Sequence, residues 1–436
     1  MAVSEESLSI IKKKVKGLVL SEEEYSVILD DISHDKLSPV EISAFFTAIA
    51  VNGLDLSETT SVTRALVNNG TQVEFGKKPV VDKHSIGGVP GNEVSIIIVP
   101  IIAAAGLTIP KTATHAITSP CGTLDVMELF CDVELNAEEM KRVVNETNGC
   151  IVCGSSVGLA PAMDKIIGAV GGLRMDPHQL MVASILAKKK ALGVDYLLMD
   201  LPTGKEAKAK DTKEAEHLAI DFTRIGHNLG IQVECAITPG DKPVGRKIGP
   251  ALEAISLLKT VKGEIIGEKA HKATALAGVL LEVTGKCKKG EGSQAAMDMI
   301  KNGKAYKKLV EIVRAQGGDE KRFGEIQLGQ FKEDIFADED GIVYGFDNGV
   351  LTSIARAAGT PQHKGAGIEL QVRRGISVKK GQKLMTIYSE SESMLDAALE
   401  VANFRDSVLL EKVLLKIVKP TFELQSGGDA GAIGKD

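Results

Sequence analysis

The segment 80–93 is the feature that most limits what this chain can fold into, because it reads as a short apolar strand, a glycine-rich turn and the start of a helix. Strand-turn-helix units of this kind belong to parallel sheets that are covered by helices. The turn contains Gly87, Gly88 and Gly91, which allow positive φ angles and let backbone N–H groups approach a ligand. The N-terminus of the following helix adds partial positive charge. The segment therefore predicts an anion-binding loop at the edge of a parallel sheet.

Two side chains in this segment indicate that the anion is phosphate. Lys83 adds a full positive charge, and Ser85 adds a hydroxyl donor. The order differs from the Walker pattern because the lysine precedes the glycines, and the three-glycine dinucleotide fingerprint is absent. From these residues alone, an ordinary strand-to-helix turn stays open as the alternative.

The remaining chain divides by its pattern into helical, alternating and β-rich parts. Short apolar strands alternate with helices around the glycine-rich segment, which predicts an α/β domain with a parallel sheet and ligands at the carboxyl ends of its strands. Two separate helical segments are predicted to form one discontinuous all-helical domain beside it, and a C-terminal segment reads as α+β. The expected boundaries are 1–68 and 161–193 for the helical domain, 79–160 and 194–330 for the α/β domain, 331–423 for the C-terminal segment and 424–436 for a flexible tail.

Start signals for three N-terminal helices stand out. Ser21 with Glu24, and Ser38 with Glu41, have the spacing of capping boxes, and a proline follows the second serine. Ser57 is expected to open the third helix.

Composition excludes several classes of function. With 436 residues and 44% hydrophobic residues, the chain is long enough for two or three domains with sizeable cores. A net charge of −6 without a basic tract argues against nucleic acid and an anionic membrane surface as partners. The N-terminus lacks the apolar core of a signal peptide, and the apolar run 94–109 is too short to span a bilayer. We therefore expect a cytoplasmic protein.

The six cysteines are scattered, which is typical of free thiols in a reducing compartment. Cys150 and Cys153 form an isolated CxxC motif without a second pair or a nearby histidine. We interpret 150–153 as a buried strand, with a metal or redox site as the less favoured alternative.

Beyond these patterns, the segment 82–89 (Asp-Lys-His-Ser-Ile-Gly-Gly-Val) resembles the phosphate-binding signature of the thymidine and pyrimidine-nucleoside phosphorylase family. Further segments look closer to the AMP phosphorylase branch of that family, and together they extend along most of the chain: 89–92, 105–112, 116–123, 159–162, 183–189 and 243–253. The resemblance implies a helical domain beside a phosphoribosyltransferase-like core. It also implies phosphorolysis of a nucleoside or nucleoside 5′-monophosphate to free base and ribose 1-phosphate or ribose 1,5-bisphosphate.

The same resemblance implies the roles of individual residues. Inorganic phosphate is a co-substrate, no cofactor is implied, and a homodimer through the helical domain is the family expectation. We expect no metal at the catalytic centre, although Glu253 with loop carbonyls could hold an alkali cation. Ser184 and Lys188 are four residues apart and so share one helix face. The implied site comprises Lys83, Ser85, Gly87, Gly88, Ser95 and Thr123 for phosphate, His115, Ser184 and Lys188 for the base or substrate, and His84 and Asp241 as catalytic residues.

Four positions depart from the family pattern. Gly168 stands where the family has a base-binding arginine, and Arg174 is the nearest substitute. Ala113 and His115 replace a serine and an arginine of the family's second phosphate loop, while Pro239 replaces an acidic residue, which leaves Asp241 as the nearby candidate acid. The chain is also expected to lack the additional N-terminal domain of AMP phosphorylases.

Two other functions stay open at this point. A non-catalytic phosphate- or nucleotide-binding relative would keep the phosphate loop, and the four departures favour it. An anthranilate-type phosphoribosyltransferase would share the fold, but Lys83-His84-Ser85 and the absence of a paired acidic motif for Mg²⁺ favour the phosphorylase.

Overall fold

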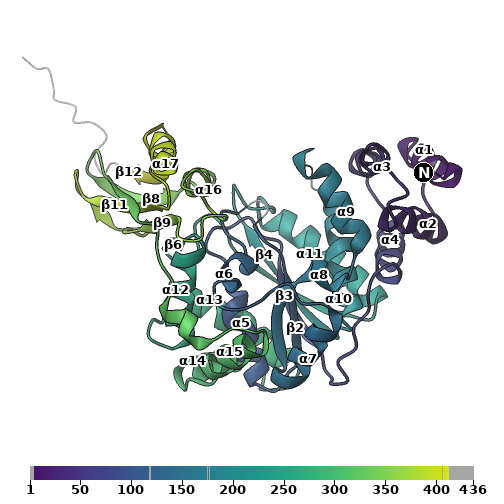
Figure 1. Cartoon of the computed structure of the whole chain (residues 1–436), viewed down its shortest axis with the longest axis horizontal. Helices are drawn as coiled ribbons and strands as arrows, with labels where there is room; N and C mark the ends of the chain where they lie inside the picture. Colours follow the sequence, from purple (N-terminus) through teal and green to yellow (C-terminus); the bar gives the residue numbers. More distant parts are fainter. Residues whose placement is uncertain (1–3, 117–118, 174, 176, 405, 412–436) are drawn as a thin grey trace, which may run out of the picture.

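The computed structural model describes residues 4–116, 119–173, 175, 177–404 and 406–411, and the structural statements below refer to these residues. N-terminal helices lie at one end of the molecule, a parallel sheet with its helices lies in the middle, and a smaller β-rich part lies at the other end (Figure 1). The predicted fold class is confirmed: α/β with a helical part, a parallel-sheet core and a C-terminal α+β segment. The predicted tail at 424–436 lies outside the described residues.

The central sheet has parallel strands in the order β5-β4-β1-β2-β3, with a bridge from Val80 to Thr108 joining β1 and β2. β1 extends further than the apolar residues suggested, because pairing with β4 places Lys83 opposite Leu198 and Ser85 opposite Asp200. The expected strand at 150–153 is confirmed as β3. The strands are β1 (Val81–Ser85), β2 (Ile109–Ala113), β3 (Gly149–Cys153), β4 (Tyr196–Thr203) and β5 (Gln232–Pro239).

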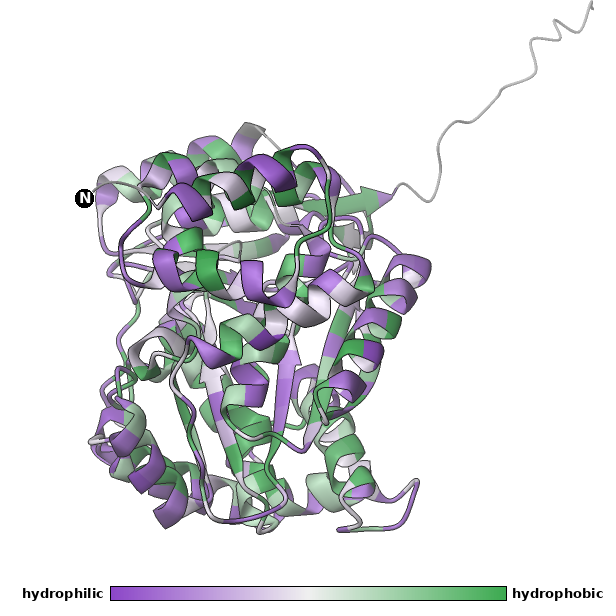
Figure 2. Ribbon diagram, turned by 90° about the vertical axis from the view of Figure 1, so that its right-hand side faces the viewer, coloured by the Kyte–Doolittle hydropathy of each residue, from purple (hydrophilic) through white to green (hydrophobic). Residues whose placement is uncertain are grey.

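Helices cover both faces of this sheet. Successive strand residues point to opposite faces, so Leu198 lies in one hydrophobic core while Leu197 and Met199 lie in the other. Several outer helices present alternating hydrophobic and hydrophilic sides (Figure 2), and no described helix is long and apolar enough to span a membrane. The helices of this part are α5 (Ser95–Ala104), α6 (Thr123–Met127), α7 (Ala137–Thr147), α8 (Gly154–Val157), α11 (Thr212–Asn228), α12 (Pro250–Val261), α13 (Glu268–Val283), α14 (Gly292–Lys301) and α15 (Lys304–Ala315).

A third core joins two helical segments that are far apart in the sequence. Both predicted capping boxes are present. The helix that was expected to begin at Ser57 is α4, and it begins earlier. The Asp55 carboxylate accepts the Glu58 N–H and so provides the cap two residues upstream of Ser57. The helices are α1 (Glu5–Val15), α2 (Glu22–Ser33), α3 (Pro39–Asn52), α4 (Leu56–Asn68), α9 (Pro161–Val170) and α10 (His178–Ala191).

Helix α10 contributes to two cores at once. Leu180, Ala183 and Ala187 pack in the helical core, whereas Val182 and Leu186 pack against the sheet. The helix therefore connects the two parts of the molecule.

The C-terminal part consists of two antiparallel sheets, β6-β9-β11-β7 and β10-β8-β12, with a fourth core between them and their helices. It touches the carboxyl edge of the central sheet, where the Asn348 side-chain amide donates to the Gly240 carbonyl (3.0 Å). Its elements are β6 (Lys247–Ile248), β7 (Phe331–Phe336), β8 (Gly341–Phe346), α16 (Asn348–Ala357), β9 (Gly367–Leu370), β10 (Ser377–Val378), β11 (Lys383–Ser389), α17 (Glu392–Phe404) and β12 (Val408–Glu411).

Candidate active site

Strands β1 and β4 and helix α13 bring two lysines and one buried carboxylate together. Lys83 Nζ lies 3.4 Å from Asp200 Oδ2, and both side chains are almost fully buried, at 1% and 0% exposure. Lys272 from α13 places its Nζ 3.3 Å from the same oxygen and keeps 12% of its side chain exposed. Thr238 Oγ1 donates to the other oxygen of Asp200 (2.6 Å). Of these residues, the sequence analysis had identified only Lys83.

These contacts keep Asp200 ionised. Burial raises the pKa of this carboxyl, but the ammonium groups of Lys83 and Lys272 and hydrogen bonds from Thr238 and Asn92 outweigh burial and leave the pKa below its usual value. The pKa of Lys272 is lowered, because burial and the nearby Lys83 ammonium outweigh the attraction of Asp200.

The predicted turn follows β1 directly. Ser85 Oγ accepts hydrogen bonds from the Asn92 side-chain amide (3.3 Å) and from the Gly87 N–H (3.4 Å). Gly87 and Gly88 have φ angles of 85° and 87°, so the conformation favours glycine as expected.

The turn ends at the N-terminus of α5, and a second helix N-terminus lies nearby. At Gly91, an added Cβ would lie 2.6 Å from the Val244 carbonyl oxygen, so the close approach requires glycine. α5 begins at Ser95, which is buried, and has no side-chain cap. α6 begins at Thr123, whose hydroxyl donates to the Glu93 carboxylate. The side chains of Ser85 and Thr123 are therefore linked to the neighbouring residues Asn92 and Glu93 just before α5.

Glu93, which accepts a hydrogen bond from the Thr123 hydroxyl, is a buried carboxyl group that the sequence analysis had not identified. Burial and the neighbouring carboxylate of Glu253 raise its pKa to about 7, although Thr123, Lys269 and Lys83 act in the opposite direction. Its protonation therefore changes near neutral pH.

The raised pKa of Glu93 predicts a pH-dependent contribution to stability. The folded state holds this proton more tightly than the unfolded state, so the contribution is full below about pH 4.5 and is lost as the pH rises through about 7. Between pH 5 and pH 8, the wild type should lose up to about 3 kcal/mol of unfolding free energy relative to Glu93→Gln. Urea unfolding of both proteins at these pH values measures the difference. A difference that does not change with pH would contradict this account.

Glu253 already has a cation beside it. Its carboxylate lies 3.2 Å from Lys269 Nζ and accepts the Gly249 N–H, and both side chains of the ion pair are almost fully buried. At the position considered for an alkali cation, the structure therefore places an ammonium group next to the carboxylate.

The opposite face of β1 carries a second set of buried charges. Asp82 Oδ2 lies 2.6 Å from Lys189 Nζ, and neither side chain is more than 1% exposed. His84 lies on the same face, and its Nδ1 is buried without a hydrogen-bond partner among the described residues. Burial and the charges of Lys189, Lys111 and Lys83 lower the pKa of His84 well below its usual value. His84 is therefore a neutral imidazole at pH 7, so it can hydrogen-bond a substrate but does not store a proton for it.

Lys111 on β2 is a further buried lysine, with 4% of the residue exposed. Its Nζ donates to the carbonyl oxygen of Thr112. Burial and the Lys189 ammonium lower its pKa to about 7. The surroundings of β1 thus contain more lysines than the sequence analysis had assigned.

Ser184 and Lys188 lie on α10 as expected, and both are partly buried. Lys188 Nζ lies 3.3 Å from Asp164 Oδ1 of α9, with 16% of the lysine side chain exposed. Lys188 is therefore not a fully solvated lysine at the end of a helix. Its largely buried ammonium group is paired with Asp164, as a buried cation requires.

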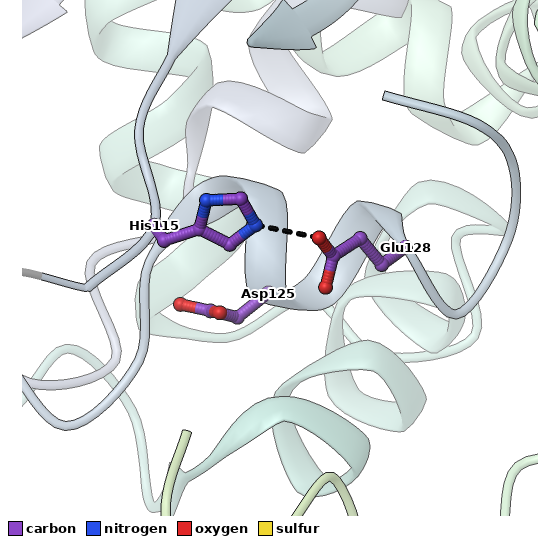
Figure 3. A group of neighbouring side chains, drawn as sticks. All are labelled: His115, Asp125 and Glu128. Atoms are coloured by element: carbon purple, nitrogen blue, oxygen red, sulfur yellow. Dashed lines mark hydrogen bonds and ion pairs between the residues drawn. The ribbon is translucent and has the colours of Figure 1, made fainter. Parts of the chain in front are cut away.

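His115 lies in a cluster with Asp125 and Glu128 (Figure 3). His115 Nε2 is 2.5 Å from Glu128 Oε1, and Lys364 Nζ from the C-terminal part is 2.7 Å from the other oxygen of Glu128 and 3.3 Å from Asp125. Three ligand-type groups converge here, but the Lys364 ammonium already contacts both carboxylates. Asp125 also accepts the N–H groups of Ala116 and Gly122, so this cluster holds the ends of the loop that precedes Thr123.

The remaining predicted positions are Asp241, Gly168, Ala113 and Arg174. Asp241 is 52% exposed and pairs with Arg374 of the C-terminal part (3.2 Å). Gly168 is exposed on α9, with open space where a Cβ would stand. Ala113 ends β2, and Arg174 lies outside the described residues.

Buried lysines and a glycine-rich turn that leads to a helix N-terminus at the edge of a parallel sheet are features with which α/β enzymes commonly bind phosphate groups. Models of protein families identify the class more closely. Residues 8–70 match the helical bundle domain of the glycosyl transferase family, residues 77–306 match its a/b domain, and residues 343–405 match the pyrimidine nucleoside phosphorylase C-terminal domain.

The chain belongs to this glycosyl transferase family and is 46% identical to an AMP phosphorylase from Pyrococcus furiosus over 96% of this chain and 84% of that protein. It is 44% identical to an AMP phosphorylase from Methanosarcina barkeri over 88% of this chain and 76% of that protein. The predicted family is therefore confirmed, and the protein is a glycosyltransferase.

The fold of this chain resembles that of a solved enzyme of different sequence. Anthranilate phosphoribosyltransferase from Thermus thermophilus superposes on 71% of this chain and 99% of its own, with a TM-score of 0.60 and 20% identity. This likeness concerns the fold alone.

Proposed function

We propose that this enzyme cleaves the N-glycosidic bond of a nucleoside 5′-monophosphate with inorganic phosphate, and that adenosine 5′-monophosphate is its main substrate. The products are the free base and ribose 1,5-bisphosphate. The observation that carries this proposal is the buried Lys83 on β1, the strand that leads into the glycine-rich turn and the uncapped N-terminus of α5. The similarity to AMP phosphorylases at 43–46% identity supports the choice of substrate.

The proposed reaction uses the two faces of β1 for different parts of the substrates. Lys83, Ser85, Ser95 and Thr123 hold inorganic phosphate, whose oxygen attacks the anomeric carbon. The bond from that carbon to the base nitrogen breaks, and its electron pair leaves with the base, which takes up a proton. A neutral His84 is suited to hydrogen-bond the base, together with Ser184 and Lys188 on α10. Asp241 is the candidate acid, but its exposed carboxylate is already paired with Arg374, which weakens this assignment.

A phosphate-dependent release assay tests the function directly. Purified protein is incubated with AMP, CMP, GMP, UMP, adenosine and thymidine, with and without inorganic phosphate, and free bases are separated by chromatography. We expect adenine release from AMP only when phosphate is present, and little release from either nucleoside. Equal release without phosphate would contradict phosphorolysis. Phosphate binding without release from any substrate would favour the non-catalytic relative.

Assembly and location are part of this proposal. Several apolar side chains on the helical part are exposed, which supports a homodimer formed through this part. Sedimentation equilibrium of wild type and of Val40→Glu tests this, with a shift toward monomer expected in the variant. The exposed apolar residues are Val15, Leu18, Val19, Val40, Val51 and Leu56.

The proposed location is the cytoplasm, since all six cysteines are free thiols.

A further inference from the structure

The ammonium groups of two lysines contact the same oxygen of Asp200, and this carboxylate is fully buried. Lys83 Nζ and Lys272 Nζ lie 3.4 and 3.3 Å from Asp200 Oδ2. Thr238 links them further, because it donates to Asp200 and accepts from Lys272 Nζ at 3.2 Å. The lysines come from different elements, β1 and α13, so the arrangement exists only in the folded chain.

The net charge of the triad Lys83, Asp200 and Lys272 determines how strongly it attracts an anion. Lys83 and Asp200 alone would form a neutral pair, and a neutral buried pair attracts an incoming phosphate only weakly. With Lys272 added, the triad carries a net charge of +1 at neutral pH. Lys272 is also the more exposed of the two lysines, at 12% against 1%, so its side chain is the more accessible to solvent.

We infer that Lys272 is a positioning residue for phosphate: it neutralises Asp200 and thereby leaves the charge of Lys83 available to the bound anion. This inference rests on the proposed function, because it takes Lys83 as the phosphate lysine. It assigns a role to a residue that lies in no motif and that is 189 positions from Lys83 in the sequence.

Lys272→Met tests the inference, with inorganic phosphate as the probe. The KM for phosphate at saturating AMP should rise by about tenfold to a hundredfold, and kcat should change much less. Lys272→Arg keeps the charge and should stay within about threefold of wild type. Lys301→Met removes an exposed lysine from the end of α14 and serves as the matched control, with unchanged kinetics.

The double variant Lys272→Met/Asp200→Asn separates neutralisation from a merely structural role. Because the carboxylate charge is removed, the double variant should recover most of the lost phosphate affinity. Affinity as poor as in Lys272→Met alone, or an unchanged KM in Lys272→Met, would overturn the inference. Calorimetric titration with phosphate keeps the two proposals distinct: a wild type that binds phosphate without turnover refutes the proposed function, while the variants still test the role of Lys272. A wild type that binds no phosphate refutes both.

Discussion

Replacing Lys83 with methionine is expected to reduce kcat/KM for phosphate by about 10²–10³-fold, because the variant loses a preorganised cation at the anion site. Lys83 is 1% exposed, so its charge acts in surroundings from which most water is excluded and is screened little. Initial rates of adenine release across a range of phosphate concentrations measure the effect.

The fold should tolerate this change. In Lys83→Met, Asp200 keeps its contacts with Lys272, Thr238 and Asn92, so no buried charge is left alone. Circular dichroism should therefore show a wild-type spectrum and a melting temperature close to that of wild type. Wild-type phosphate kinetics in a folded Lys83→Met protein would remove this residue from the proposed site.

The largest effect on stability is expected in the helical part, for Glu58→Ala. Glu58 lies 2.7 Å from Lys14 Nζ, and the two side chains are 4% and 2% exposed. Its carboxylate also accepts hydrogen bonds from the Leu20 N–H and the Tyr25 hydroxyl. Removing it leaves a buried ammonium group unpaired, which should cost about 3–5 kcal/mol. Thermal unfolding and faster hydrogen exchange in α1–α4 would report the loss.

An exposed ion pair in the same part provides the control. Glu22 and Arg64 lie 3.3 Å apart with 41% and 47% of their side chains exposed, so Glu22→Ala should cost less than about 1 kcal/mol. In the double variant Lys14→Met/Glu58→Leu, apolar groups replace both charges, and much of the stability should return. Equal effects of Glu58→Ala and Glu22→Ala would show that burial does not determine the value of these pairs.

Local signals explain what could be predicted from the sequence. Capping boxes, glycines with positive φ and short apolar strands each depend on neighbours within a few residues, and these predictions agree with the structure. The end of β1 was missed because Lys83 and Ser85 are polar, and only the pairing with β4 makes them strand residues. Similarly, Asp55 rather than Ser57 caps α4, since both types are good caps and the sequence alone does not rank them.

The charged residues that contact Lys83 could be identified only from the folded structure. Asp200 and Lys272 stand in an apolar strand and a helix, where single charged residues carry no recognisable signal, and contact with Lys83 spans more than a hundred residues. His84 was predicted as a catalytic residue, yet its burial and lysines from α10 and β2 lower its pKa well below the usual value. Such long-range electrostatic effects follow from tertiary packing and leave no local pattern.

The double membership of α10 has a consequence for the proposed site. One side of this helix packs in the helical core and the other side packs against the sheet, while Lys189 fixes it to Asp82 on β1. Ser184 and Lys188 therefore stand on a helix that is held to β1 by packing and by a buried ion pair. The residues proposed to bind the base are thus tied to the strand that carries residues proposed to bind phosphate.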